Sequence, residues 1–246
     1  MQSHEPKQYK LLKNLIIAST STVYGSGYLE YLFSALIQLF EDTEEIVFIP
    51  YARPGGISHD QYTEIAAKAF QKIGKKVVGL HTFENTTQAI KNAKGIFTGG
   101  GNTFVLVSAL INKGVMEPLR TVITSGTPYL GTSAGSNICG INMKTTNDMP
   151  IVYPASFKTL GVVPFNINPH YLDPDPSSKH MGETRETRIQ EFHTQNKIPV
   201  IGIREGGWLR VIGEKIKLEG NAQARIFTAG KTPYELAVSS DLSDLH

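Results

Sequence analysis

The serine best placed to act as a nucleophile is Ser133, at the centre of the segment 131–135 (GTSAG). An apolar run at 127–130 (TPYL) precedes it, and a segment compatible with a helix follows. A serine on a sharp strand-to-helix turn needs small neighbours, because the chain doubles back there. Free N–H groups at the start of the helix would favour a developing negative charge. The pattern predicts a nucleophile elbow; the alternative is a glycine- and serine-rich turn without a catalytic role.

A second glycine-rich turn, 99–104 (GGGNTF), directly follows the apolar run 95–98 (GIFT). It resembles a dinucleotide-binding loop, but the G-x-G-x-x-G pattern fails at Phe104. Bare backbone at the carboxyl end of a strand can instead offer N–H donors to a substrate oxyanion. We therefore expect Gly100 or Gly101, together with Ala134, to form an oxyanion hole. The alternative is a tight turn that needs glycine for steric reasons alone.

A serine is a weak nucleophile unless a base removes its proton, and the chain has seven histidines. His170 ends the segment 165–170 (FNINPH), in which apolar and polar residues alternate up to a stiffening proline. His180 is the second candidate. The alternative for either is an ordinary hydrogen-bonded loop histidine. The remaining histidines lie at the chain ends or in polar and helix-surface contexts: His4, His59, His81, His193 and His246.

Two acidic residues could fix the tautomer of such a base and stabilise its imidazolium form. Asp148 lies in 145–150 (TTNDMP), between the nucleophile and His170 in the sequence. Glu205 lies in 203–208 (IREGGW), just past a predicted strand. Either could be a turn carboxylate, and spacing does not decide between them.

Two arginines, Arg185 and Arg188, lie three residues apart, on one face of a predicted helix at 184–195. Paired guanidinium groups suit bidentate capture of a carboxylate, as an acidic substrate would require. The alternative is a solvated face on which neighbouring glutamates are the partners. Those glutamates are Glu183, Glu186 and Glu191.

The elements that must position these residues alternate between short apolar runs and segments of helical periodicity. Such alternation with short links predicts a mostly parallel sheet with helices on both faces. The region 144–182 has many prolines and little periodicity, and it is predicted to be an ordered loop. Predicted strands lie at 15–18, 45–50, 76–80, 95–98, 199–203, 208–212, 215–218 and 224–227, and predicted helices at 28–40, 60–73, 103–112 and 115–124. A tight turn at 213–214 is predicted to join two of these strands in a hairpin.

Composition narrows the class of protein. The chain has 246 residues, and its net charge of +2 gives no electrostatic argument for nucleic acid, so a small partner is expected. The single cysteine, Cys139, cannot form an internal disulfide, which fits a reducing compartment. No apolar stretch approaches the ~20 residues that span a bilayer. We therefore expect a cytoplasmic protein without membrane contact, built as one α/β domain over 1–246 with flexible ends at 1–10 and 238–246.

Six segments occur here in the order found in the peptidase E family, and the chain resembles that family over nearly its whole length. They are GGGNTF (99–104), GTSAGSN (131–137), TTNDMPIV (145–152), INPH (167–170), GETRETRI (182–189) and REGGW (204–208). These α-aspartyl dipeptidases belong to the serine peptidase family that also contains cyanophycinase. The resemblance implies a glutamine-amidotransferase-like, flavodoxin-type sheet and no metal or organic cofactor.

The resemblance also implies roles for particular residues. Ser133 matches the family's nucleophile and His170 its general base. Asp148 and Glu205 are both candidates for the acidic third member of the catalytic triad. We favour Glu205, at a strand end, which leaves Asp148 to orient its loop or to meet the substrate's amino group.

The expected activity is hydrolysis of dipeptides with an N-terminal aspartate by a monomer or homodimer. Arg185 and Arg188 are expected to read the aspartate side chain, with Asn102 as a further substrate contact. Two alternatives remain open: a cyanophycinase-like β-aspartyl peptidase, and a non-catalytic module that binds a small molecule on the same fold.

Overall fold

The computed structural model describes residues 13–246 except 176, 178 and 180, so the expected flexible segment 1–10 and His180 lie outside it. Its larger sheet has seven strands in the order β3-β2-β4-β5-β1-β8-β9. The first five strands in that order are parallel, β8 pairs antiparallel with β1, and β9 pairs antiparallel with β8. The strands are β1 (Asn14–Ala18), β2 (Glu45–Ile49), β3 (Lys76–Gly79), β4 (Ile96–Thr98), β5 (Tyr129–Thr132), β8 (Gly207–Ile212) and β9 (Lys215–Gly220).

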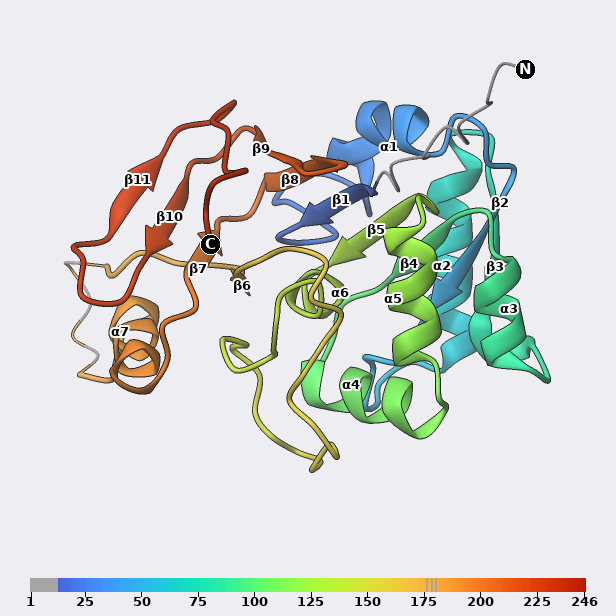
Figure 1. Cartoon of the computed structure of the whole chain (residues 1–246). Coiled ribbons are helices and arrows are strands. Elements are labelled where there is room, and N and C mark those ends of the chain that lie inside the picture. Colours follow the sequence, from blue (N-terminus) through green and yellow to red (C-terminus); the bar gives the residue numbers. More distant parts are fainter. Residues whose placement is uncertain (1–12, 176, 178, 180) are drawn as a thin grey trace, which may run out of the picture.

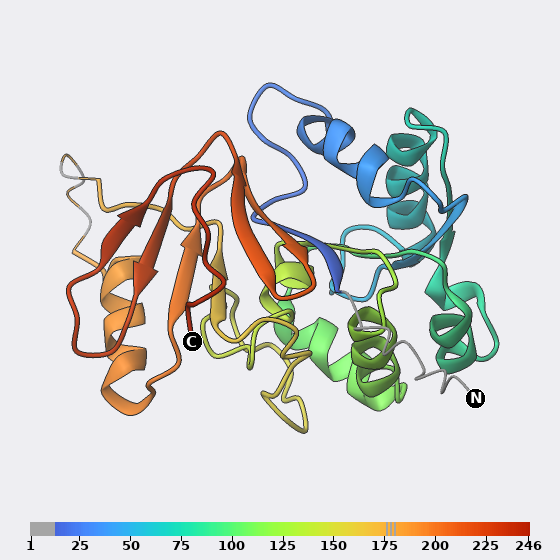
Figure 2. The same cartoon turned by 45° about the horizontal axis from the view of Figure 1, so that its top comes forward.

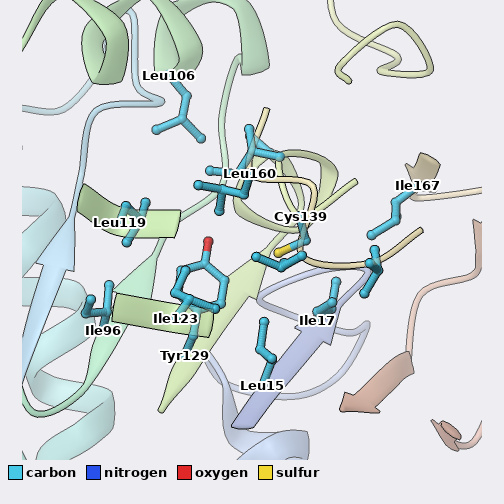
Figure 3. Close-up of a cluster of buried hydrophobic side chains, with 14 of the residues drawn as sticks. Leu15, Ile17, Ile96, Leu106, Leu119, Ile123, Tyr129, Cys139, Leu160 and Ile167 are labelled. Atoms are coloured by element: carbon cyan, nitrogen blue, oxygen red, sulfur yellow. The ribbon is translucent and has the colours of Figure 1, made fainter. Parts of the chain in front are cut away.

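Helices cover both faces of this sheet (Figure 1). Side chains of a strand point to alternate faces, and β1 shows the two layers. Ile16 and Ala18 pack with α1 (Phe33–Leu39) and α2 (His59–Gln71). Leu15 and Ile17 belong to the cluster on the other face, where Figure 3 shows them with Leu106, Leu119 and Ile123. The helices of that second face are α3 (Thr86–Asn92), α4 (Thr103–Asn112) and α5 (Met116–Thr124).

A second sheet, of four strands, lies beside the first in the order β11-β10-β7-β6 (Figure 2). Its strands are β6 (Asn166–Pro169), β7 (Val200–Ile203), β10 (Ala224–Phe227) and β11 (Tyr234–Leu236). Helix α7 (Arg185–Gln195) packs on it through Ile189, which meets Val200 and Phe227. Because Ile201, Ile203 and Ile226 share one buried cluster with Leu15, both sheets contribute to a common core. That core favours a single domain, which stays a prediction.

The fold class expected from the sequence, a mostly parallel sheet covered on both faces, is confirmed, and so is the β8–β9 hairpin. Helix α3 and strand β11 lie in segments for which no element was predicted, and three other elements differ from their prediction. The helix expected at 28–40 begins as a 3-10 turn, Glu30–Leu32, before α1, because Leu29 ahead of it has left-handed backbone (φ 59°). Strand β6 lies within the region predicted to be loop. The helix after Ser133, α6 (Ala134–Asn137), has only four residues.

The segment 238–246, expected to be a flexible tail, instead packs along β9. The Ser239 N–H donates to the Leu218 carbonyl at 2.7 Å, and the Leu218 N–H donates to the Ser240 carbonyl at 3.0 Å. Leu242 is 4% exposed. Strand β9 is at the edge of its sheet, so the segment satisfies backbone groups that would otherwise be open to pairing. In the described part of the chain, no helix is long and apolar enough to cross a membrane.

Candidate active site

Ser133 occupies the turn between β5 and α6, with φ 53° and ψ −110°. A non-glycine residue in such backbone costs on the order of 1–3 kcal/mol and persists only where its surroundings hold it. Here the Ser133 N–H donates to the Ala18 carbonyl of β1 at 3.2 Å. A Cβ atom at Gly135 would collide with the Thr98 carbonyl, and one at Gly131 with the Gly135 carbonyl. The small residues of the GTSAG segment are therefore required by close backbone packing.

Cys139 lies in the turn that follows α6. It is fully buried, and burial raises the pKa of its thiol. A neutral, inaccessible thiol does not compete with Ser133 as a nucleophile.

The glycine-rich turn after β4 lies beside Ser133 because β4 and β5 are adjacent parallel strands. A Cβ atom at Gly100 would come within 2.9 Å of the Ser133 Cβ. Gly101 has φ 143°, and a Cβ there would collide with the Ala52 carbonyl. Within the described residues, the N–H groups of Gly100, Gly101 and Ala134 have no acceptor. All three residues line the same cavity as Ser133, which is the arrangement an oxyanion hole requires.

His170 follows β6, and its Nε2 atom lies 2.9 Å from the Ser133 Oγ. The residue has left-handed backbone (φ 52°), which Ser19 holds in place. The His170 N–H donates to the Ser19 hydroxyl at 2.8 Å, and that hydroxyl donates to the Ile203 carbonyl at 2.7 Å. A fully buried serine at the end of β1 thus joins the histidine to the end of β7.

Glu205 lies next to His170 because β6 and β7 pair in parallel, with Pro169 opposite Ile203. Its Oε1 atom is 2.7 Å from the His170 Nδ1. The neighbouring Arg204 makes two hydrogen bonds to Asp173, at 2.8 and 2.7 Å. These bonds hold the pKa of Asp173 below its usual range. Arg204 therefore joins the loop after His170 to the loop that carries Glu205.

Asp148 makes different contacts. Its Oδ2 accepts hydrogen bonds from the Thr103 N–H at 2.7 Å and from the Thr146 hydroxyl at 2.9 Å. It thus supports the first turn of α4. Asp148 lines the cavity, and in the part of the chain that the structure describes it makes no hydrogen bond to His170.

Of the three residues expected to bind substrate, Arg185 lines the cavity and Arg188 and Asn102 do not. Arg185 lines the cavity, and its Nη1 is buried without a hydrogen-bond partner among the described residues. Burial, followed by the charge of Arg188, lowers the pKa of Arg185. Arg188 is largely exposed, lies 3.8 Å from Glu183 and is absent from the cavity lining.

Asn102, the third expected substrate contact, also does not line the cavity. Its Oδ1 accepts from the Val105 N–H at 3.1 Å and so caps α4. Its amide donates to the Met149 carbonyl at 2.9 Å, which holds the loop beside Asp148.

The cavity itself measures ≈ 360 Å³. Four residues that no sequence pattern indicated also line it: Arg53, Thr20, Ser21 and Asn147. Arg53 could have been found, because it follows β2 at the carboxyl edge where open α/β sheets place their sites. A larger hollow of ≈ 690 Å³ beside β2 and α3 contains none of the predicted site residues.

A hydroxyl, an imidazole and a carboxylate thus form one hydrogen-bonded chain beside main-chain N–H groups that have no acceptor in the described part of the chain. This arrangement can deprotonate a serine, hold the tetrahedral oxyanion and return the proton to a leaving group. It is suited to acyl transfer to a serine.

Comparison with known proteins agrees with this chemistry. Residues 15–219 match the profile of peptidase family S51. The chain is 47% identical to "Peptidase E" of Streptomyces coelicolor, over 94% of each chain. It is 45% identical to the "Probable alpha-aspartyl dipeptidase" of Drosophila melanogaster, over 95% of this chain and 97% of the relative.

Solved structures share the fold. The crystal structure of a peptidase from an acI-B1 actinobacterium has a TM-score of 0.71 at 18% identity, covering 95% of this chain and 97% of the other. A putative peptidase E of Listeria monocytogenes has a TM-score of 0.65 at 22% identity, covering 86% of this chain and 100% of the other.

Proposed function

The chain belongs to peptidase family S51, and from that premise we propose that it is a serine dipeptidase that cleaves Asp-Xaa dipeptides through an aspartyl-enzyme intermediate. The observation that carries the proposal is the 2.9 Å contact between Ser133 Oγ and His170 Nε2, in the cavity that Gly100, Gly101 and Ala134 also line. The name of the Drosophila relative supports the substrate class, and that of the Streptomyces relative supports a peptidase.

In this mechanism Ser133 Oγ attacks the carbonyl of the N-terminal aspartate while His170 Nε2 accepts the hydroxyl proton. Glu205 keeps the imidazole in the required tautomer and stabilises its cationic form. The N–H of Ala134, with that of Gly100 or Gly101, holds the oxyanion, and each such donor is typically worth ~3–4 kcal/mol. His170 then protonates the leaving amine, and water hydrolyses the aspartyl ester.

Recognition of the aspartate falls to Arg185 and Asp148. The buried Nη1 of Arg185, which has no hydrogen-bond partner among the described residues, is suited to the side-chain carboxylate of the substrate. The recorded hydrogen bonds of Asp148 use only Oδ2, so Oδ1 is available to the substrate's ammonium group. A cavity of ≈ 360 Å³ is near the lower end of the roughly 300–1,000 Å³ of small-molecule sites, which suits a dipeptide.

A dipeptide panel that varies the first residue tests this function. We expect Asp-Leu to be cleaved well and Ala-Leu poorly, and Ser133→Ala to reduce kcat by about a millionfold. Arg185→Met should remove the preference for Asp-Leu over Ala-Leu, whereas the matched control Arg188→Met should keep it. An unchanged preference in Arg185→Met would contradict the assignment of that residue.

Two further measurements separate the alternatives. Faster turnover of β-Asp-Arg than of α-Asp-Arg would favour the cyanophycinase-like activity. Failure of a fluorophosphonate probe to label Ser133, with dipeptide binding retained, would favour a non-catalytic binding module.

A further inference from the structure

Arg53 is a cation in the cavity that the mechanism above does not use. It lies on the loop after β2 and lines the cavity together with Ser133 and Gly100. Its side chain is solvent-exposed. In the described part of the chain, no hydrogen bond or ion pair reaches its guanidinium, whose recorded contact is with an aromatic ring.

That ring belongs to Tyr62, which holds the guanidinium in a defined place. The Arg53 Cζ lies 4.8 Å from the centre of the ring. Tyr62 is 1% exposed, and its ring packs edge-on against Phe48 at 4.9 Å. Its hydroxyl donates to the Gly100 carbonyl at 3.1 Å. Stacking on a rigid ring leaves the edge of the guanidinium free, so its N–H donors stay available for a carboxylate.

The two cavity arginines occupy different surroundings. Arg185 lies close enough to Glu205 and Asp148 for both carboxylates to raise its pKa, although burial lowers the pKa overall. Arg53 lies instead beside Tyr62 and Tyr28: burial raises the pKa of the Tyr28 hydroxyl, and the charge of Arg53 opposes that rise. One cation therefore lies on the side of Asp148, and the other on the side of α2 and the glycine-rich turn.

An Asp-Xaa dipeptide carries two carboxylates, one on each side of the scissile bond. The ammonium group and the side-chain carboxylate both belong to the acyl residue, and the proposed function assigns them to Asp148 and Arg185. The remaining anion is the terminal carboxylate of the leaving residue. We propose that Arg53 binds this carboxylate and so selects dipeptides over longer or amidated peptides. The inference rests on the proposed function.

Substrates that differ only at this carboxylate test the proposal: Asp-Leu and its C-terminal amide, Asp-Leu-NH₂. A charge-assisted hydrogen bond to a carboxylate predicts that the wild type prefers Asp-Leu by roughly 10- to 100-fold in kcat/KM. The contact is the same in the ground state and the transition state, so the difference should lie in KM. Arg53→Met should raise KM for Asp-Leu to the value for the amide and leave turnover of the amide unchanged.

Matched variants keep the result interpretable. Arg53→Lys retains the charge but loses the planar fork, and it should show an intermediate preference. Lys113→Met is the control, because Lys113 stacks on Tyr51 at 5.2 Å and does not line the cavity. It should keep the wild-type preference.

Two outcomes would overturn the proposal: equal losses on both substrates in Arg53→Met, or a wild type indifferent to amidation. A wild type that cleaves neither substrate would instead overturn the proposed function, and the inference with it.

Discussion

Replacement of Glu205 by Gln tests which acid supports the histidine. The change removes the negative charge and preserves the shape of the side chain that lies 2.7 Å from the His170 Nδ1. We expect kcat for Asp-Leu to fall by about 30- to 1,000-fold with KM little changed, because the imidazolium forms only as the reaction proceeds. Asp148→Asn should instead raise KM. Asp148 contacts Thr103 and Thr146, not His170, and its carboxylate is assigned to the substrate's ammonium group.

The magnitude follows from the exposure of the pair. The Glu205 side chain is 54% exposed and that of His170 33%. Two unit charges roughly 4 Å apart attract by about 4 kcal/mol at the effective dielectric constant near a protein surface, and by about 1 kcal/mol in water. For this half-exposed pair we take about 2–4 kcal/mol, which corresponds to the loss of about 30- to 1,000-fold in kcat given above. The loss should therefore be smaller than the ~10⁴-fold found when a buried triad loses its acid charge.

The assay is steady-state hydrolysis of Asp-Leu at saturating and limiting concentrations for both variants. Glu214→Gln is the matched control, because Glu214 is an exposed glutamate that pairs with Lys13 at 3.2 Å, remote from the cavity lining. A Glu205→Gln enzyme within threefold of the wild-type kcat would refute the assignment. So would an Asp148→Asn enzyme that loses kcat to the same extent at unchanged KM.

Three further predictions concern the surroundings of the site. Ser19→Ala leaves the His170 N–H and the Ile203 carbonyl unpaired, so the free energy of unfolding should fall by about 1–3 kcal/mol, as urea titration can show. Labelling of Ser133 by a fluorophosphonate should also slow by about tenfold, and unchanged labelling would contradict the role given to Ser19. Gly101→Ala should lower Tm and activity together, because the positive φ of Gly101 is strained for alanine and the new Cβ would collide with the Ala52 carbonyl. Gly55→Ala is the control: its Cβ would meet open space, so neither Tm nor activity should change. Hydrogen bonds from Arg204 lower the pKa values of Asp173 and Glu235 in the folded state. The two carboxylates therefore stabilise the fold fully above about pH 5, and this contribution declines as the pH falls below about 4. The urea midpoint of Arg204→Met should therefore fall less than that of the wild type between pH 5 and pH 3, and equal slopes would count against this ion-pair network.

The end of β1 holds the backbone of both Ser133 and His170. The Ala18 carbonyl accepts the Ser133 N–H, and the Ser19 hydroxyl accepts the His170 N–H. Both acceptor residues are fully buried, and both donor residues have left-handed backbone. Conformations that are unfavourable for isolated residues are thus stabilised by one rigid strand, which fixes the distance between nucleophile and base.

The sequence alone determined most of the elements and the local chemistry of the turns. Periodicity predicted 103–112 and 224–227 with the bounds that α4 and β10 have, because burial of one face repeats at helical or strand spacing. The glycines around Ser133 indicated a sharp turn, because the steric requirement acts between near neighbours in the chain. Local signals were weaker for β6, whose alternating pattern was included in a proline-rich region predicted to be loop.

Only the tertiary structure decided which of the candidate partners meet. Glu205 rather than Asp148 contacts His170, because β6 pairs in parallel with β7 and this register brings the two strand ends together. Arg185, and not Arg188, reaches the cavity, because the packing of α7 on the second sheet sets which side of the helix faces it. Such choices depend on contacts between segments far apart in the sequence, which composition and spacing along one chain do not encode.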